Sequence, residues 1–159
     1  MQVRIIAVGK IKERFLSDGI AEFEKRLVPY LKLSITEIAE ERRGVHASGS
    51  QEQQAKEKEG ERILAALPEG TYVIALDILG TELSSEGLAA RLREMQMAGT
   101  ASVTVIIGGD LGLSGAVLAR ARLRLSLSPM TFTHQMARLI LLEQLYRACR
   151  INSGEPYHK

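Results

Sequence analysis

Three short runs of β-branched and aliphatic residues divide the chain, and stretches with helical periodicity separate them. The runs are QVRIIAV at 2–8, TYVIAL at 71–76 and SVTVII at 102–107. Runs of this length with few polar residues are typical of strands covered on both faces of a parallel sheet. Strands that alternate with helices predict an α/β domain with a mostly parallel sheet flanked by helices.

Weaker patterns complete this interpretation. Polar and apolar residues alternate over 31–37, which predicts a strand with one solvated face, and again over 123–127. We therefore expect a sheet of five to six strands. Helices are expected over 13–27, 51–66, 84–99, 115–119 and 133–151, and an exposed loop is expected over 39–50.

The composition is that of one globular domain. The chain has 159 residues, of which 45% are hydrophobic and 25% are charged, and we expect a single domain over 1–159. Its one cysteine, Cys149, excludes an intrachain disulfide and a cysteine zinc cluster. No apolar run is long enough to cross a membrane and the first residues lack a signal-peptide pattern, so we expect a cytoplasmic protein.

Basic residues gather toward the end of the chain. Seven basic and two acidic residues lie within 115–159, whereas acidic residues are in slight excess before it. This bias favours a polyanion as the partner of the C-terminal part. Scattered arginines that keep a surface soluble would give the same count, so charge alone leaves both interpretations open.

Three loops follow predicted strands and are candidates for a ligand site, because ligands bind at the carboxyl edge of open α/β sheets. They span 76–80, 108–112 and 126–132. The glycines of GGDLG at 108–112 would let backbone groups approach a ligand closely. The segment is neither a dinucleotide fingerprint nor a P-loop, so it indicates either a pocket for a flat nucleoside or a tight turn.

The segment LSLSPMTF at 125–132 is unusually apolar for a connection between a strand and a helix. Pro129 removes one backbone donor and fixes the direction of the chain. Met130 and Phe132 would line an apolar slot for an adenine or a sulfonium methyl group. Simple packing of a buried loop is the alternative.

The expected final helix carries more apolar surface than one sheet face needs, which favours packing against the same helix of a twofold-related copy. Glu143 and Arg147 are spaced to form an i,i+4 ion pair. Arg150 has no acid at that spacing and fits a phosphate better. The apolar positions are Met136, Leu139, Ile140, Leu141, Leu142, Leu145 and Tyr146.

The chain ends in GEPYHK, which combines an aromatic ring, an imidazole and a cation. Tyr157 can stack on a base, His158 can accept a proton near neutral pH and Lys159 can meet a phosphate. A frayed terminus without function is the alternative. The other histidines, His46 and His134, are distant in the sequence, so no metal site is expected.

Taken in order from Val3 to Lys159, six segments resemble the RlmH (YbeA-like) family of SPOUT-class methyltransferases. The resemblance implies a deep trefoil knot in the C-terminal third, a homodimer, and S-adenosylmethionine bound in the knot. It also implies methylation of N3 of a pseudouridine in the helix 69 region of 23S ribosomal RNA, on the large subunit or the assembled ribosome. The segments are IIAVGKIKERF, KEKEGERIL, ALDILGTELSSEGLA, VTVIIGGDLGLS, LSLSPMTFTHQMARLILLEQLYRA and GEPYHK.

The same resemblance assigns residues to the site. Arg147, Tyr157 and His158 would act at the target nucleotide, with the tail of one protomer serving the pocket of the other. His158 would assist deprotonation and Arg147 would stabilise the anionic ring. Candidate RNA contacts are Arg138, Arg150 and Lys159. The cofactor would contact Leu76, Gly108, Leu127, Ser128, Pro129, Met130, Thr131 and Phe132.

Two other classes remain as alternatives. A non-catalytic nucleotide-binding α/β module would use the glycine loop and leave the tail frayed. A hydrolase built on Asp110, His134 and a serine would lack the usual G-x-S-x-G elbow. Neither Asp110 nor the loop over 39–50 is given a role in the methyltransferase interpretation.

Overall fold

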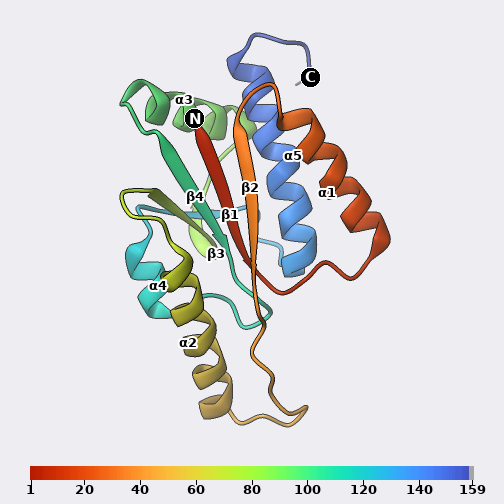
Figure 1. Cartoon of the computed structure of the whole chain (residues 1–159), viewed down its shortest axis with the longest axis vertical. Coiled ribbons are helices and arrows are strands. Elements are labelled where there is room, and N and C mark those ends of the chain that lie inside the picture. The colour runs from red at the N-terminus through yellow and green to blue at the C-terminus, as the bar shows by residue number, and fades with distance from the viewer. Residues whose placement is uncertain (158–159) are drawn as a thin grey trace.

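The three apolar runs form the three central strands of one sheet. In a computed structural model, which describes residues 1–157, the strand order is β2-β1-β4-β3-β5 and every neighbouring pair is parallel (Figure 1). The prediction of a mostly parallel sheet is confirmed, and the sheet has five strands. The strands are β1 (Gln2–Val8), β2 (Lys32–Ile38), β3 (Tyr72–Glu82), β4 (Ser102–Ile107) and β5 (Leu123–Ser126).

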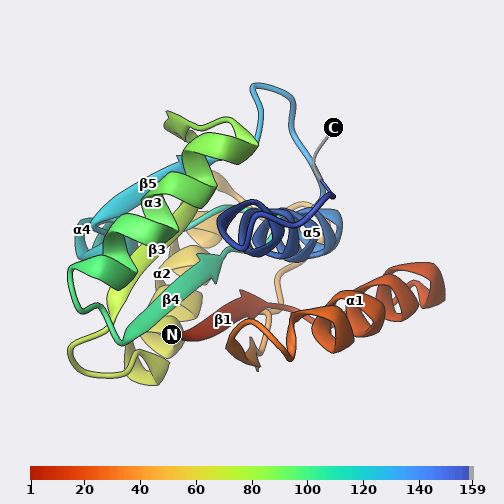
Figure 2. The same ribbon diagram turned by 90° about the horizontal axis from the view of Figure 1, so that it is seen from above.

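Helices cover both faces of this sheet. Figure 2, seen from above, shows α3 and α5 on one side of the strands, and α1 packs against α5. The helices α2 and α4 lie together on the opposite side. The helices are α1 (Arg14–Leu27), α2 (Gly49–Ala66), α3 (Ser85–Met97), α4 (Gly115–Arg120) and α5 (His134–Asn152).

Two apolar cores follow from the alternation of side chains along the strands. In β1, Ile5 packs into the core beneath α1, α3 and α5, whereas Ile6 packs with Ile63 of α2 and Val117 of α4. Both isoleucines are fully buried. This explains why the central strands show no polar face in the sequence.

Strand β3 is longer than the run over 71–76 predicts. Its pairing with β5 is interrupted between Leu76 and Thr81, where the register shifts, and then resumes. Gly80 permits this bulge, because a Cβ there would lie 2.5 Å from the carbonyl oxygen of Arg124. The bulge carries residues 77–80 past the end of β4, to the carboxyl edge of the sheet.

Side-chain caps set where several helices begin. Ser48 and Gln51 form a capping box at α2, so this helix starts at Gly49 and the expected loop over 39–50 ends earlier than predicted. Thr133 caps α5 by accepting a hydrogen bond from the Met136 N–H at 3.2 Å. Between residues 1 and 157, we find no helix long and apolar enough to span a bilayer. The trefoil knot remains a prediction.

Candidate functional site

The carboxyl ends of β3, β4 and β5 line one open cleft of about 1120 Å³. The segments over 107–113 and 125–133 contribute much of its lining, and 76–78 lies between them at the end of β3. The first turns of α1 and α5 also contribute lining residues. The three loops singled out in the sequence therefore meet at one place, because the carboxyl ends of parallel strands share one edge.

A glycine turn after β4 brings main chain to the cleft. A Cβ on Gly108 would lie 2.8 Å from the carbonyl carbon and oxygen of Gly112, so only glycine fits this approach. Gly112 adopts φ 78°, and its N–H donates to the carbonyl of Gly109 at 3.1 Å. This turn is tight, and it is also a lining element of the cleft.

The connection from β5 to α5 presents apolar side chains. The hydroxyl of Ser128 accepts from the N–H of Met130 at 3.0 Å, and Ser126 donates to the carbonyl of Ser128 at 3.1 Å. In this conformation Met130 is 75% exposed and Phe132 is 39% exposed, and both line the cleft. The apolar character of this loop therefore belongs to an open slot and not to core packing.

Most of the expected cofactor residues gather here. Pro129 does not line the cleft, but the other predicted cofactor residues do: Leu76, Gly108, Leu127, Ser128, Met130, Thr131 and Phe132. Asp77, which belongs to the predicted loop over 76–80 and is paired with Arg124, also lines the cleft. Phe15, which is 64% exposed at the start of α1, was not predicted. Phe15 occupies an apolar position in a helical pattern, so only the fold reveals that it lies at the cleft.

Two of the residues expected to act on the target nucleotide, Arg147 and Tyr157, form a second cluster with Glu143. The predicted pair is confirmed, with Arg147 Nη2 donating to Glu143 Oε1 at 2.6 Å. Tyr157 donates to the same oxygen at 3.2 Å, and the Arg147 guanidinium lies 4.7 Å from the centre of its ring. Burial raises the pKa of the Tyr157 phenol, and the Glu143 carboxylate adds to this shift.

This second cluster is distant from the cleft within one chain. Met136 lines the cleft, and Arg147 follows it by three turns of α5, which places it about 16 Å further along the helix axis. Figure 1 shows α5 running from the carboxyl edge of the sheet to the opposite edge, where the described chain ends. His158 and Lys159 lie outside the described residues.

Arg150 does not fit the role predicted for it. The prediction rested on the absence of an acidic partner, but Arg150 Nη1 forms an ion pair with Glu155 at 2.6 Å. It also lies 3.4 Å from the Tyr30 hydroxyl. Helical spacing could not reveal Glu155, because this residue follows the end of α5. The premise that Arg150 lacks a partner is wrong.

Arg138 is buried, which argues against the RNA contact predicted for it. The residue is 2% exposed, its Nη1 donates to Glu37 at 2.7 Å, and its Nη2 donates to the carbonyl of Gly9 at 3.0 Å. A phosphate cannot reach a guanidinium enclosed in this way. Arg138 instead joins α5 to the carboxyl ends of β1 and β2.

Replacing Arg138 by alanine is expected to lower the free energy of unfolding by about 3 kcal/mol, because the partners lose a buried charged donor. Urea denaturation would measure this loss. Arg91→Ala is the matched control, since Arg91 is exposed and its nitrogen is 3.9 Å from Glu94, and a change below about 0.5 kcal/mol is expected there. Equal midpoints for both variants would contradict a structural role for Arg138.

The contacts of Asp110 do not match the role that the hydrolase hypothesis would give it. It forms an ion pair with Arg43, and this contact holds the pKa of its carboxyl below the ordinary value although burial opposes the shift. Among residues 1–157, no hydrogen bond connects Asp110 to His134 or to a serine side chain. The geometry therefore gives no support to a triad at this position.

Fold and cleft together define an α/β protein that can hold a nucleoside-like ligand between a glycine turn and an apolar loop. The comparisons with known proteins identify the family. The family described as "Predicted SPOUT methyltransferase" matches residues 1–158, and the chain belongs to it.

Similarity to known proteins extends over the full length of the chain. A protein of Methanoregula boonei named "Putative ribosomal RNA large subunit methyltransferase H" is 73% identical over 159 residues, which is all of both chains. A protein of Halothermothrix orenii named "Ribosomal RNA large subunit methyltransferase H" is 54% identical with the same full coverage. The resemblance to the RlmH family is confirmed, and membership of a methyltransferase family argues against the other two classes.

Two solved structures have a fold similar to that of this chain. A probable methyltransferase from Bordetella pertussis superposes with a TM-score of 0.56 at 17% identity, covering 93% of this chain and 96% of that one. A probable methylase family protein from Haemophilus influenzae gives 0.53 at 13% identity, covering 99% and 70%. At these identities, the similarity concerns the fold alone.

Proposed function

We propose that this protein is a homodimeric, cytoplasmic methyltransferase that uses S-adenosylmethionine to methylate N3 of a pseudouridine in the helix 69 region of 23S ribosomal RNA. The acceptor is the assembled ribosome. The names of the full-length relatives support large-subunit ribosomal RNA as the substrate. The resemblance of the six sequence segments supports the particular nucleotide.

The residues at the cleft fit S-adenosylmethionine. The Gly108 turn offers main-chain atoms to a nucleoside, and Leu76, Met130 and Phe132 offer apolar contacts. The hydroxyls of Ser128 and Thr131 lie in the same lining. When bound, this cofactor supplies a methyl group that is already activated on a sulfonium centre.

The dimer is supported above all by the distance between the cleft and Arg147. Three helical turns separate the two along α5, so one chain cannot bring its own Arg147 and Tyr157 to its own cleft in this conformation. A stripe of partly exposed side chains at helical spacing runs along α5 from the cleft to the Arg147 cluster. It consists of Met136, Ile140, Glu143 and Arg147.

Antiparallel pairing of two α5 helices would bring the two clusters together. With a twofold axis near Ile140, the start of one helix lies beside the second half of the other. Arg147 of the partner subunit then reaches the cleft, and the tail follows it. The exposed apolar side chains of Phe15, Ile78 and Met130 around the cleft would be covered by such a copy.

The chemistry required of the protein is alignment and proton removal. N3 of a pseudouridine carries a proton at neutral pH and becomes nucleophilic when that proton leaves. Arg147 would stabilise the resulting anion, and Tyr157 would orient the base by stacking. His158 is the candidate for accepting the proton. In the free protein, Glu143 holds Arg147 over the Tyr157 ring, so these groups are already paired before RNA arrives.

Methyl transfer from labelled S-adenosylmethionine to ribosomes tests the proposal. We expect stoichiometric labelling of ribosomes that carry the pseudouridine, and none of ribosomes from a strain that lacks the pseudouridine synthase. Naked 23S RNA is expected to be a poor acceptor, because the chain offers little basic surface. Equal labelling of ribosomes with and without pseudouridine would contradict the proposed nucleotide, and labelling of neither would contradict the proposed substrate.

A further inference from the structure

Helix α2 supports the glycine turn from behind without lining the cleft. Gly60 lies so close to Ser114, the cap of α4, that a Cβ at position 60 would overlap the serine hydroxyl. The neighbouring residue, Glu59, is only 2% exposed. A carboxyl is therefore buried directly behind the wall of the cofactor cleft.

The two oxygens of Glu59 have different surroundings. Oε1 accepts a hydrogen bond from the N–H of Glu41 at 2.9 Å. Oε2 is buried and has no hydrogen-bond partner among the described residues. It faces the glycine turn, since a Cβ built on Gly109 would lie 3.5 Å from it. Burial raises the pKa of this carboxyl, and the nearby acids Glu40 and Asp110 act in the same direction.

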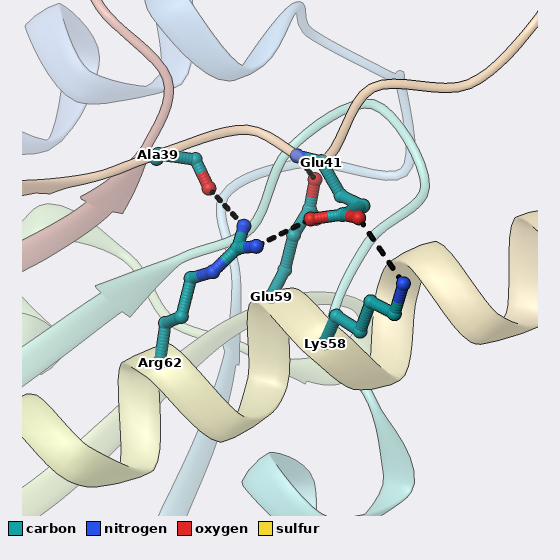
Figure 3. A network of polar contacts seen from close by, with 5 residues as sticks. All are labelled: Ala39, Glu41, Lys58, Glu59 and Arg62. Carbon is teal, nitrogen blue, oxygen red and sulfur yellow. Dashed lines mark hydrogen bonds and ion pairs between the residues drawn. The ribbon is translucent and has the colours of Figure 1, made fainter.

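The segment over 39–43 links α2 to the same turn. Arg62 donates to the carbonyl of Ala39 at 3.0 Å and pairs with Glu41. The Glu41 carboxylate also contacts Lys58 at 3.4 Å. Figure 3 shows these contacts from close by. Two residues further on, Arg43 pairs with Asp110, which lines the cleft. The segment is thus fixed to α2 at one end and to the glycine turn at the other.

We propose that Glu59 is a positioning residue for the cofactor: it fixes Glu41 with one oxygen, fills the space beside Gly109 with the other, and so sets the conformation of the 108–112 turn. Glu59 acts through the turn and touches neither cofactor nor substrate. The proposal rests on the proposed function, because it takes S-adenosylmethionine as the ligand of the cleft. The proposal also assigns a role to the ion pair of Arg43 and Asp110, which connects the 39–43 segment to the turn. The sequence alone assigned no role to either residue.

The side chain at position 59 needs an acceptor for the Glu41 N–H and a polar group of the same length beside Gly109. Glutamine provides both without a charge in a buried position, whereas alanine provides neither and leaves a donor unpaired. Glu59→Gln is therefore expected to preserve the turn, and Glu59→Ala is expected to loosen it. Glu61→Ala is a matched control, because Glu61 is exposed on the same helix.

Two measurements on the full-length protein test this. In calorimetric titration with S-adenosylmethionine, Glu59→Ala should raise Kd about tenfold, whereas Glu59→Gln should stay within about twofold of the wild type. At saturating cofactor, turnover should change far less than Kd. Without cofactor, hydrogen exchange of residues 108–113 should accelerate in Glu59→Ala while the amides of α5 keep their protection.

Arg43→Gln provides a second variant should Glu59→Ala fail to fold, because it removes the Asp110 pair at the other end of the segment. It is expected to raise Kd and to accelerate exchange at 108–113. Unchanged Kd and exchange in the folded variants, or exchange that increases equally throughout the chain, would overturn the positioning role. A wild-type protein that does not bind S-adenosylmethionine would instead contradict the proposed function, and the exchange experiment would still decide the role of Glu59.

Discussion

Replacing Gly108 by alanine is expected to raise the Kd for S-adenosylmethionine by about a hundredfold, because opening the turn would remove main-chain contacts that together contribute about 2.8 kcal/mol of binding free energy. The new Cβ would lie 2.8 Å from two backbone atoms of Gly112 and 3.1 Å from Leu113 Cδ2. A flexible side chain could move aside, but backbone cannot yield without opening the turn. The turn at the end of β4 would therefore have to open, and it lines the cleft.

Calorimetry measures this effect, and thermal unfolding measures the accompanying strain, which should cost about 1–3 kcal/mol. The matched control is Gly115→Ala in the first turn of α4. A Cβ there meets nothing within 4 Å, so both affinity and stability should be retained. Binding by Gly108→Ala with the affinity of the wild type would show that the ligand does not depend on this turn.

Mixed dimers of Gly108→Ala and Arg147→Ala are expected to recover methyl transfer at cofactor concentrations near the wild-type Kd, where each variant alone has little activity. If the partner subunit supplies Arg147, one heterodimer contains one site in which both the cleft and the arginine are intact. The other site in that heterodimer carries both defects. One of the two sites is intact in each isolated heterodimer, so its activity per dimer should reach about half of the wild-type value.

The experiment requires co-expression of two differently tagged chains, followed by isolation of the heterodimer and methyl transfer to ribosomes. Native mass spectrometry of each variant is the control that dimers still form. Heterodimers without activity would mean that Arg147 serves the cleft of its own chain, which would require a different conformation of the C-terminal region. Full activity of Arg147→Ala by itself would remove this residue from the reaction.

Sequence patterns correctly predicted those features that depend on residues close together in the chain. The runs at 2–8 and 102–107 coincide with β1 and β4, because each is apolar on both faces. The spacing of Glu143 and Arg147 predicted their ion pair. The predicted end of the third strand near residue 76 was wrong, since the bulge beyond it is stabilised by pairing with β5, which lies far along the chain.

The arginines of α5 show the limit of such patterns. The partners of Arg138 are separated from it by 101 and 129 positions, so helical spacing assigns this residue to a polar face that the fold buries. Likewise, Glu59 lies in a charged helix where burial is not evident from the sequence. Its position behind the glycine turn follows from the close packing of Gly60 on Ser114.

The α/β class, the parallel sheet and the three loops of the cleft could all be predicted from the sequence, because side-chain periodicity acts within short segments and strands alternate with helices along the chain. Its ordered motifs also indicated the methyltransferase family. Tertiary structure alone decided which charges are buried, which side chains face the cleft, and that Arg147 lies three helical turns away from it. These properties depend on contacts between residues distant in the chain, and such contacts exist only once the layers have packed.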